Sequence, residues 1–376
     1  MIYLDNASTK KPSDAAKKSF LSHIDEYGNP SNSHSLGMSA HTLIKNARCG
    51  IINLLGGCVG DNLIFTSGGS EANNLAINTA KALGIKHSKR RVIISAFEHD
   101  SLFASATALK KDDFEIITIK PNGYGIITPN SIANAIDKNT VMVSVMTVNN
   151  ELGTIQPIGD IGRICRKTGV VFHTDAVASV GHIKTDVNRD NIDMLSFSAH
   201  KFGGFKGVGG LYARNGIEIS PMILGGHQQK KFRAGTENVL GICSAYEALL
   251  DADRSIEQNR ARAYSLMQML IDGINKIPEC VINTKIGYDF PYTLNFSLRD
   301  INSDAVLMML DEAGICASSG AACISSERSP SRSLLAIGRD DESALNRIRF
   351  SISEENTESE ISFVIDKLND IINTLR

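Results

Sequence analysis

Two stretches of the sequence decide the fold: Val170-Val-Phe-His-Thr-Asp175-Ala176 and Ser196-Phe-Ser198-Ala-His200-Lys201. Each follows or contains an apolar run of the kind that forms a buried strand, and each brings a charged residue to the end of that run. Asp175 and Lys201 therefore fall at the carboxyl ends of two candidate parallel strands. Ligands bind at that edge of open α/β sheets, so we expect both side chains at the ligand crevice.

The same pattern extends outward from about residue 60 to residue 215, where short apolar runs alternate with helical stretches. Such alternation is typical of a mostly parallel sheet wrapped by helices. Candidate helices cover 73–82 and 158–167, with a glycine after each and a proline before the second. Candidate strands cover 63–66, 92–95, 114–119, 141–147, 170–174, 192–197 and 208–213.

The pattern changes after about residue 237 to long helical stretches and then to an α+β segment. We expect a large α/β domain over 16–255, and a smaller α+β domain made of 1–15 and 256–376. The final predicted helix, 357–375, starts with a capping box, Thr357-x-x-Glu360. We interpret its apolar stripe as core packing rather than a partner surface.

The composition excludes several classes of protein. The chain has 376 residues, with 39 Lys and Arg against 41 Asp and Glu, and this balance argues against nucleic acid held by general electrostatics. The N-terminus lacks the basic and apolar regions of a secretory signal, and no stretch is long and apolar enough for a membrane span, so we expect a cytoplasmic protein. Seven cysteines without a C-x-x-C pair predict neither a disulfide framework nor a zinc site.

A third stretch, Leu63-Ile-Phe-Thr-Ser-Gly-Gly-Ser-Glu-Ala-Asn-Asn74, is a strand that runs through a glycine turn into a helix. Such a turn exposes N–H groups that can hold a phosphate, although a plain tight turn has the same local sequence. Pyridoxal phosphate needs both a lysine, which joins its aldehyde, and an acid, which keeps its ring nitrogen protonated. Lys201 and Asp175 satisfy that need, although a lysine taken singly is most often a solvated surface residue.

Ten short motifs in one order cover nearly the whole chain: Tyr3-Leu-Asp-Asn-Ala, Gly28-Asn-Pro-Ser-Asn-Ser-His34, Thr66-Ser-Gly-Gly-Ser-Glu-Ala-Asn-Asn, Glu98-His99, Asn149-Asn150-Glu151-Leu-Gly-Thr, His173-Thr-Asp175-Ala, Ser198-Ala-His-Lys201, Arg233-Ala-Gly-Thr236-Glu-Asn, Ser318-Ser-Gly-Ala-Ala-Cys323 and Ile348-Arg349-Phe-Ser. With these motifs the chain resembles the cysteine desulfurases of the NifS/IscS group, within the class V aminotransferase-like enzymes. The resemblance implies a pyridoxal-phosphate fold of type I, with a seven-stranded, mostly parallel sheet in the large domain. It also implies conversion of L-cysteine to L-alanine.

Carried over residue by residue, the resemblance implies that Lys201 holds the cofactor, Asp175 pairs with its ring nitrogen, and His99 stacks on the ring and shuttles protons. Asn150 would lie beside the ring oxygen and the substrate carboxylate. The planar fork of Arg349 would clamp that carboxylate.

The resemblance also implies a set of phosphate ligands: Gly69, Ser70, Ser198 and His200, joined by Thr236 from the neighbouring subunit. A homodimer follows if Thr236 crosses over.

Cys323 lies in a stretch of small and polar residues, Ala317-Ser-Ser-Gly-Ala-Ala-Cys-Ile-Ser-Ser-Glu-Arg-Ser-Pro-Ser. This composition is too weakly apolar to anchor a core and predicts a mobile loop. The resemblance implies that Cys323 attacks the substrate sulfur, becomes a persulfide and passes sulfur to an acceptor protein. An iron–sulfur scaffold and a tRNA thiolation enzyme are equally open as acceptors.

Three positions depart from the family pattern: Ala178 stands where a glutamine is usual, Phe205 where a proline is usual, and Ser353 where a glycine is usual. We expect Asn150 or a water to replace the missing glutamine. Two other functions stay open: a selenocysteine lyase or another lyase or aminotransferase with the same cofactor, and a catalytically reduced sulfur-transfer partner or scaffold. A swinging thiol at Cys323 favours the desulfurase, because amino transfer does not require one.

Overall fold

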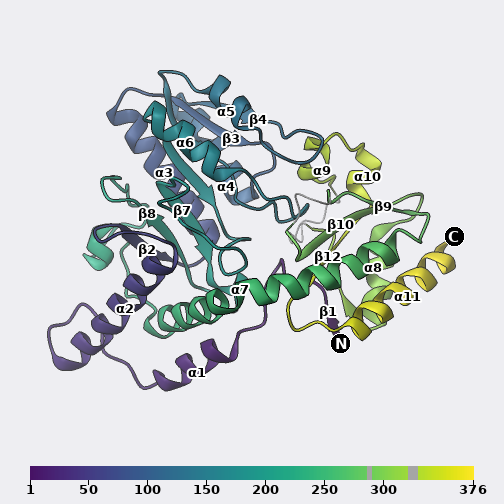
Figure 1. Cartoon of the computed structure of the whole chain (residues 1–376). Helices are drawn as coiled ribbons and strands as arrows, with labels where there is room; N and C mark the ends of the chain where they lie inside the picture. Colours follow the sequence, from purple (N-terminus) through teal and green to yellow (C-terminus); the bar gives the residue numbers. More distant parts are fainter. Residues whose placement is uncertain (286–289, 321–328) are drawn as a thin grey trace.

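A seven-stranded sheet forms the centre of the larger lobe in the computed structural model, which describes residues 1–285, 290–320 and 329–376 (Figure 1). Only β8 runs antiparallel to its neighbours; the other adjacent strands are parallel. All seven predicted strands and the predicted fold class are therefore confirmed. The strands in spatial order are β2 (Asn62–Thr66), β8 (Gly209–Ala213), β7 (Met194–Ser198), β6 (Val171–Asp175), β5 (Thr140–Ser144), β3 (Arg91–Ser95) and β4 (Glu115–Ile119).

Helices cover both faces of this sheet, which explains why its strands are continuously apolar instead of alternating. Ile64 and Met194 pack on one face with α3 (Gly69–Lys86) and α4 (Asp100–Ala108). Their neighbours Leu63 and Leu195 pack on the other face. The helices on that side include α2 (Ser35–Leu54), α6 (Ile158–Thr168) and the first part of α7 (Val239–Ile274).

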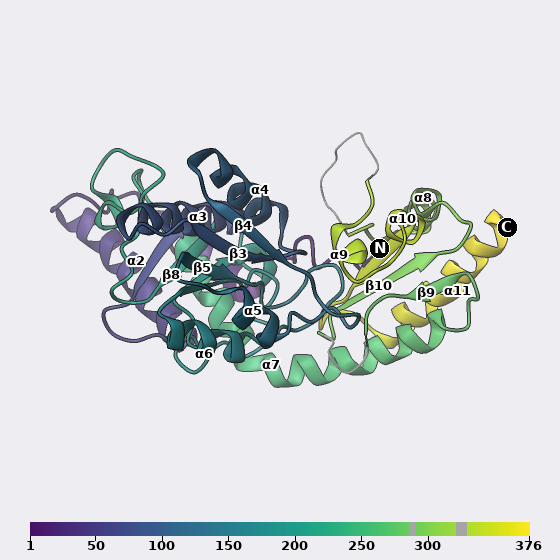
Figure 2. The ribbon, with the colours of Figure 1, turned by 90° about the horizontal axis from the view of Figure 1, so that it is seen from above.

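The helix α7 is 36 residues long and runs from the larger lobe along the second lobe (Figures 1 and 2). Its residues from Val239 to Leu249 join the core of the large sheet, and those from Ala263 to Ile274 join a separate apolar core. The predicted boundary near residue 255 falls between these two halves, within one continuous helix.

The second lobe contains a three-stranded antiparallel sheet in the order β12 (Arg347–Ser351), β10 (Thr293–Leu298), β9 (Cys280–Ile282). A parallel pair joins β1 (Ile2–Tyr3) to β11 (Ile315–Cys316), so the N-terminus packs with this lobe. The capping box that starts α11 (Glu358–Leu375) is present, and most of its apolar stripe is buried in this core, which confirms both predictions. The other α-helices in the described part of the chain are α1 (Asp14–Ser22), α5 (Pro129–Ala135), α8 (Ser303–Glu312), α9 (Arg332–Ala336) and α10 (Asp341–Leu345).

Within the described ranges, no helix is both long enough and apolar enough to cross a membrane.

Candidate active site

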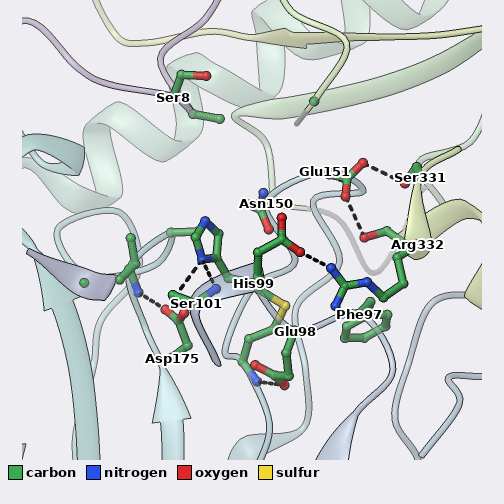
Figure 3. Close-up of a pocket in the computed structure, with 18 of the residues that line it drawn as sticks. Ser8, Phe97, Glu98, His99, Ser101, Asn150, Glu151, Asp175, Ser331 and Arg332 are labelled. Carbon is green, nitrogen blue, oxygen red and sulfur yellow. Dashed lines mark hydrogen bonds and ion pairs between the residues drawn. The ribbon is translucent and has the colours of Figure 1, made fainter. Parts of the chain in front are cut away.

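A cavity of about 460 Å³ lies at the carboxyl ends of β6 and β7, with walls from both lobes (Figure 3). The structure brings most of the predicted site residues to this one cavity. They are Gly69, Ser70, His99, Asn150, Asp175, Ser198, His200, Lys201 and Arg349.

Lys201 ends the short 3₁₀ turn Ala199–Lys201 that follows β7. Its Nζ donates to the backbone oxygens of Ala7 and Ser8, with the bond to Ser8 at 2.9 Å. Burial lowers the pKa of Lys201 to about 8, and the positive charge of Arg349 acts in the same direction. Near neutral pH, a useful fraction of this amine is therefore in the unprotonated form that can attack a carbonyl carbon.

Asp175 is the last residue of β6 and is buried. Its Oδ1 accepts the Val177 N–H at 2.9 Å, and its Oδ2 accepts the side-chain amide of Asn73 at 2.7 Å. These two donors compensate the burial of the carboxylate and fix its orientation.

His99 is the N-cap of α4, and its ring lies in the cavity. Its Nδ1 accepts the Ser101 N–H at 3.2 Å and lies 2.8 Å from the Ser101 hydroxyl. The first turn of α4 thus fixes the ring through contacts to Nδ1, and the dashed lines in Figure 3 run from Nδ1 to Ser101.

Arg349 lies on β12 and is 1% exposed. Its Nη2 donates to Asp5 Oδ1 at 2.9 Å and to Ser8 Oγ at 2.8 Å. Its Nη1 donates to the carbonyl oxygens of Asn150 and Gly320 at 3.0 and 3.1 Å, while its buried Nε has no partner. The fork is therefore already occupied by groups of the protein itself, a contact that the sequence did not predict.

Glu98 lines the same cavity and is 2% exposed. Its Oε1 accepts the Ser95 hydroxyl at 2.5 Å and the Met146 N–H at 2.9 Å, whereas its Oε2 has no partner. Burial raises the pKa of Glu98 to about 8, and the negative charge of Asp175 adds to this effect. Glu98 is therefore mostly a neutral carboxylic acid at pH 7.

His200 joins the cavity wall next to Lys201, with its Nδ1 3.1 Å from Thr9 Oγ1. Burial and the nearby Lys201 and Lys206 lower the pKa of His200 to about 4. The ring is thus neutral at pH 7.

Ala178, the main departure from the family pattern, lies between the large cavity and a second cavity of about 30 Å³ behind Lys201. Asn150 and His182 also line the small cavity, which is large enough for a water molecule. Phe205 packs against Phe20, with ring centroids 5.0 Å apart.

Two predicted residues do not appear in the cavity. Thr236 is exposed and does not line it. Cys323 lies outside the described residues, but Gly320 and Ser329, described residues on either side of it, both line the cavity.

The sequence missed several contacts that organise the site: Asp5, Ser8, Asn73, Ser101 and Glu98. Four of them are part of, or next to, the motifs Tyr3-Leu-Asp-Asn-Ala, Thr66 to Asn74 and Glu98-His99, so their positions were marked but their roles were not. Ser101 lies outside these motifs, and its place two residues after His99 was the only feature of the sequence that pointed to it.

The chain matches the aminotransferase class-V family over residues 2–364. It is 36% identical to the cysteine desulfurase IscS of Methanosarcina thermophila, covering 100% of this chain and 93% of that protein. It is 38% identical to the cysteine desulfurase IscS of Dictyoglomus turgidum, covering 100% and 95%.

Solved structures agree with these sequence matches. A NifS-like protein superimposes with a TM-score of 0.93 at 30% identity, covering 100% of both chains. SspA in complex with cysteine superimposes with a TM-score of 0.81 at 32% identity, covering 95% of this chain and 100% of that one.

The fold and the cavity, with its lysine and its buried carboxylate, define an enzyme of the class that binds its cofactor at the carboxyl edge of an α/β sheet. The chain belongs to the aminotransferase class-V family. The resemblance to cysteine desulfurases of the NifS/IscS group is confirmed by full-length relatives of that name.

Proposed function

We propose that this cysteine desulfurase takes sulfur from L-cysteine onto Cys323 and releases L-alanine, using pyridoxal 5′-phosphate held on Lys201. The observation that carries the proposal is the meeting of Lys201, Asp175 and Arg349 around one cavity. These three supply an amine of lowered pKa, a buried carboxylate and a guanidinium fork, which are the groups that the cofactor and an amino-acid substrate need.

The residues at the cavity fit this cofactor. The first turn of α3 has N–H groups without helix partners, and Gly69 and Ser70 of that turn line the cavity. A Cβ atom on Gly69 would lie 2.5 Å from Val177 Cγ2, so glycine allows the helix start to lie close to the loop after β6. Ser198 lies beside this helix start, and the neutral His200 lines the same cavity. Such a helix start suits a phosphate group.

When bound, the cofactor supplies an aldehyde for Lys201 and a ring that accepts electrons from the substrate carbon. Asp175 would hold the proton on the ring nitrogen, because its carboxylate is fixed by Asn73 and Val177. His99 would lie against the ring and transfer protons.

Arg349 would hold the substrate carboxylate together with Asn150. Because its Nη2 already donates to Asp5 and Ser8, an incoming carboxylate would take over those hydrogens or share them. Where the substrate takes over those hydrogens, Arg349 would exchange the carboxylate of Asp5 for that of the substrate.

Cys323 would attack the substrate sulfur, forming the persulfide as the bond between sulfur and the substrate β-carbon breaks. The positions of Gly320 and Ser329 support this role, because both flanks of the segment lie at the cavity. A sulfur-acceptor protein would then receive the sulfur, and an iron–sulfur scaffold or a thiolation enzyme fits that role.

Thr236 would bind the cofactor phosphate of a second subunit in a homodimer. Its exposure and its absence from the cavity of its own chain support this arrangement.

The proposal is tested by incubating the purified protein with L-cysteine and measuring alanine and the mass of the peptide that contains Cys323. We expect a gain of one sulfur atom on that peptide and loss of alanine production in Cys323→Ala. The exposed Cys49 and Cys58 provide matched controls, since Cys49→Ala and Cys58→Ala should keep full activity. Full alanine production by Cys323→Ala would contradict the desulfurase mechanism, and the same assay with L-selenocysteine measures the competing lyase activity.

A further inference from the structure

Asn73 joins two groups that have separate roles in the proposed function. This residue is 0% exposed and lies on α3. Its side-chain amide donates to Asp175 Oδ2 at 2.7 Å and to Ser101 Oγ at 3.0 Å. One amide group therefore holds both the carboxylate of Asp175 and the hydroxyl beside His99.

The orientation of this amide is set by Asp175. A flipped amide would place the carbonyl oxygen of Asn73 against the carboxylate, where both atoms are acceptors. The carbonyl oxygen Oδ1 has no partner in the observed orientation, although it is buried. Leaving a buried acceptor unpaired costs free energy, so the two bonds donated by the amide must outweigh that cost.

The orientation of the amide then sets the hydroxyl of Ser101. Since Ser101 Oγ accepts a hydrogen from Asn73, its own hydrogen is free to point at His99 Nδ1, 2.8 Å away. The Ser101 N–H also points at His99 Nδ1, and a backbone N–H can only donate. Nδ1 therefore faces two donors and is the acceptor nitrogen of the ring.

We infer that Asn73 and Ser101 are positioning residues that couple Asp175 to His99 and hold the ring proton of His99 on Nε2. The chain of bonds runs in one direction: the carboxylate orients the amide, the amide orients the hydroxyl, and the hydroxyl joins the Ser101 N–H in donating to Nδ1. His99 then presents Nε2–H on the side of the ring away from Ser101, as a donor rather than an acceptor. The inference rests on the proposed roles of Asp175 and His99.

The opposite tautomer meets two obstacles in this geometry. A proton on Nδ1 would face the Ser101 N–H, and the Ser101 hydroxyl would need another acceptor. The charged groups near this network are Asp175, Lys201 and Asp100, which forms an ion pair with Arg332. The neutral carboxylic acid of Glu98 lines the same cavity.

The test uses nitrogen-15 NMR of the imidazole nitrogens in protein labelled at histidine, without cofactor, with the His99 signals assigned from a His99→Asn variant. We expect wild-type His99 to carry its proton on Nε2. Ser101→Ala removes only the hydroxyl, and we expect a larger share of the Nδ1-protonated form. Asn73→Ala should shift the ring in the same direction, because it releases the Ser101 hydroxyl.

Asn78 provides the matched control on the same helix. Its amide donates to the Ser220 carbonyl at 2.9 Å, away from the cavity, so Asn78→Ala should leave the His99 signals unchanged. A wild-type ring protonated on Nδ1, or signals unchanged in Ser101→Ala, would overturn the inference. Ser101 is only partly buried, so we expect Ser101→Ala to keep the fold, and the test then does not depend on Asn73→Ala.

Kinetics of the loaded enzyme separate this inference from the proposed function. We expect Ser101→Ala to lower kcat with L-cysteine about tenfold, with little change in KM. A positioned acid or base contributes roughly 10²–10⁴-fold to the rate, and loss of its positioning should remove part of that contribution. A wild-type enzyme that makes no alanine from L-cysteine would refute the proposed function, whereas the NMR result would still decide the coupling. An equal kcat for Ser101→Ala and wild type would contradict a role of the pair in the reaction.

Discussion

Glu98→Gln should remove a pH dependence of stability that comes from one buried carboxyl group. Glu98 is 2% exposed, and burial raises its pKa from an ordinary value of 4.5 to about 8, with a further contribution from Asp175. Its Oε1 accepts from Ser95 and Met146, bonds that a glutamine oxygen can also accept. The variant therefore keeps the shape of the group and removes the titration.

The sign and size of the effect follow from proton linkage. Between pH 4.5 and 8, folded Glu98 holds a proton that the unfolded chain has lost, so the free energy of unfolding falls as the pH rises. One proton corresponds to about 1.4 kcal/mol per pH unit, or about 5 kcal/mol across the whole window as an upper bound. The contribution is complete below pH 4.5, declines between pH 4.5 and pH 8, and is fully lost above pH 8.

Urea unfolding of the wild type and of Glu98→Gln at several values from pH 6 to pH 8 measures this directly. We expect the difference between the two free energies of unfolding to change by about 1.4 kcal/mol per pH unit near pH 6, and by less towards pH 8 where folded Glu98 itself titrates, in favour of the variant at higher pH. Glu312→Gln, at an exposed position at the end of α8, is the control and should follow the wild type. Parallel profiles for the wild type and Glu98→Gln would refute the assignment of a neutral buried acid.

Three further predictions concern the cavity. Capture of pyridoxal phosphate by the cofactor-free protein should become faster as the pH rises through about 8, because only the neutral amine of Lys201 attacks the aldehyde. After borohydride reduction, peptide mass should locate the adduct on Lys201, and Lys201→Ala should carry none. Arg349→Lys should raise KM for L-cysteine by about tenfold or more, since a point charge cannot replace the bidentate fork, and an unchanged KM would contradict the clamp. Ala178→Gln should move the midpoint of the absorbance titration of the bound cofactor, because the new side-chain amide would enter the small cavity that Asn150 lines. An unchanged midpoint would count against the idea that Asn150 or a water replaces the missing glutamine.

Much of the fold could be predicted because its elements are written in local patterns. The strands of the large sheet are short apolar runs with helices on both faces, so residues such as Leu63 and Ile64 are both buried and the run is continuous. The capping box and the apolar stripe of α11 were predictable for the same reason, because each depends on spacing along one helix. The continuous course of α7 across both cores was not predictable, since nothing in its local sequence marks where one core ends and the other begins.

By itself, the sequence determined the chemical groups of the site and the family to which the chain belongs. Asp175 and Lys201 each follow an apolar strand, and parallel strands bring their carboxyl ends to one edge, so their placement follows from pattern and sheet geometry.

The tertiary structure alone decided the state of these groups. The lowered pKa of Lys201 depends on burial beneath Ala7 and Ser8, and the occupied fork of Arg349 depends on Asp5, all of which lie far away along the chain. The bonds from Asn73 to Asp175 and Ser101 likewise join three separate segments. Desolvation and hydrogen-bond direction depend on which atoms surround a group in space, and local sequence does not record those neighbours.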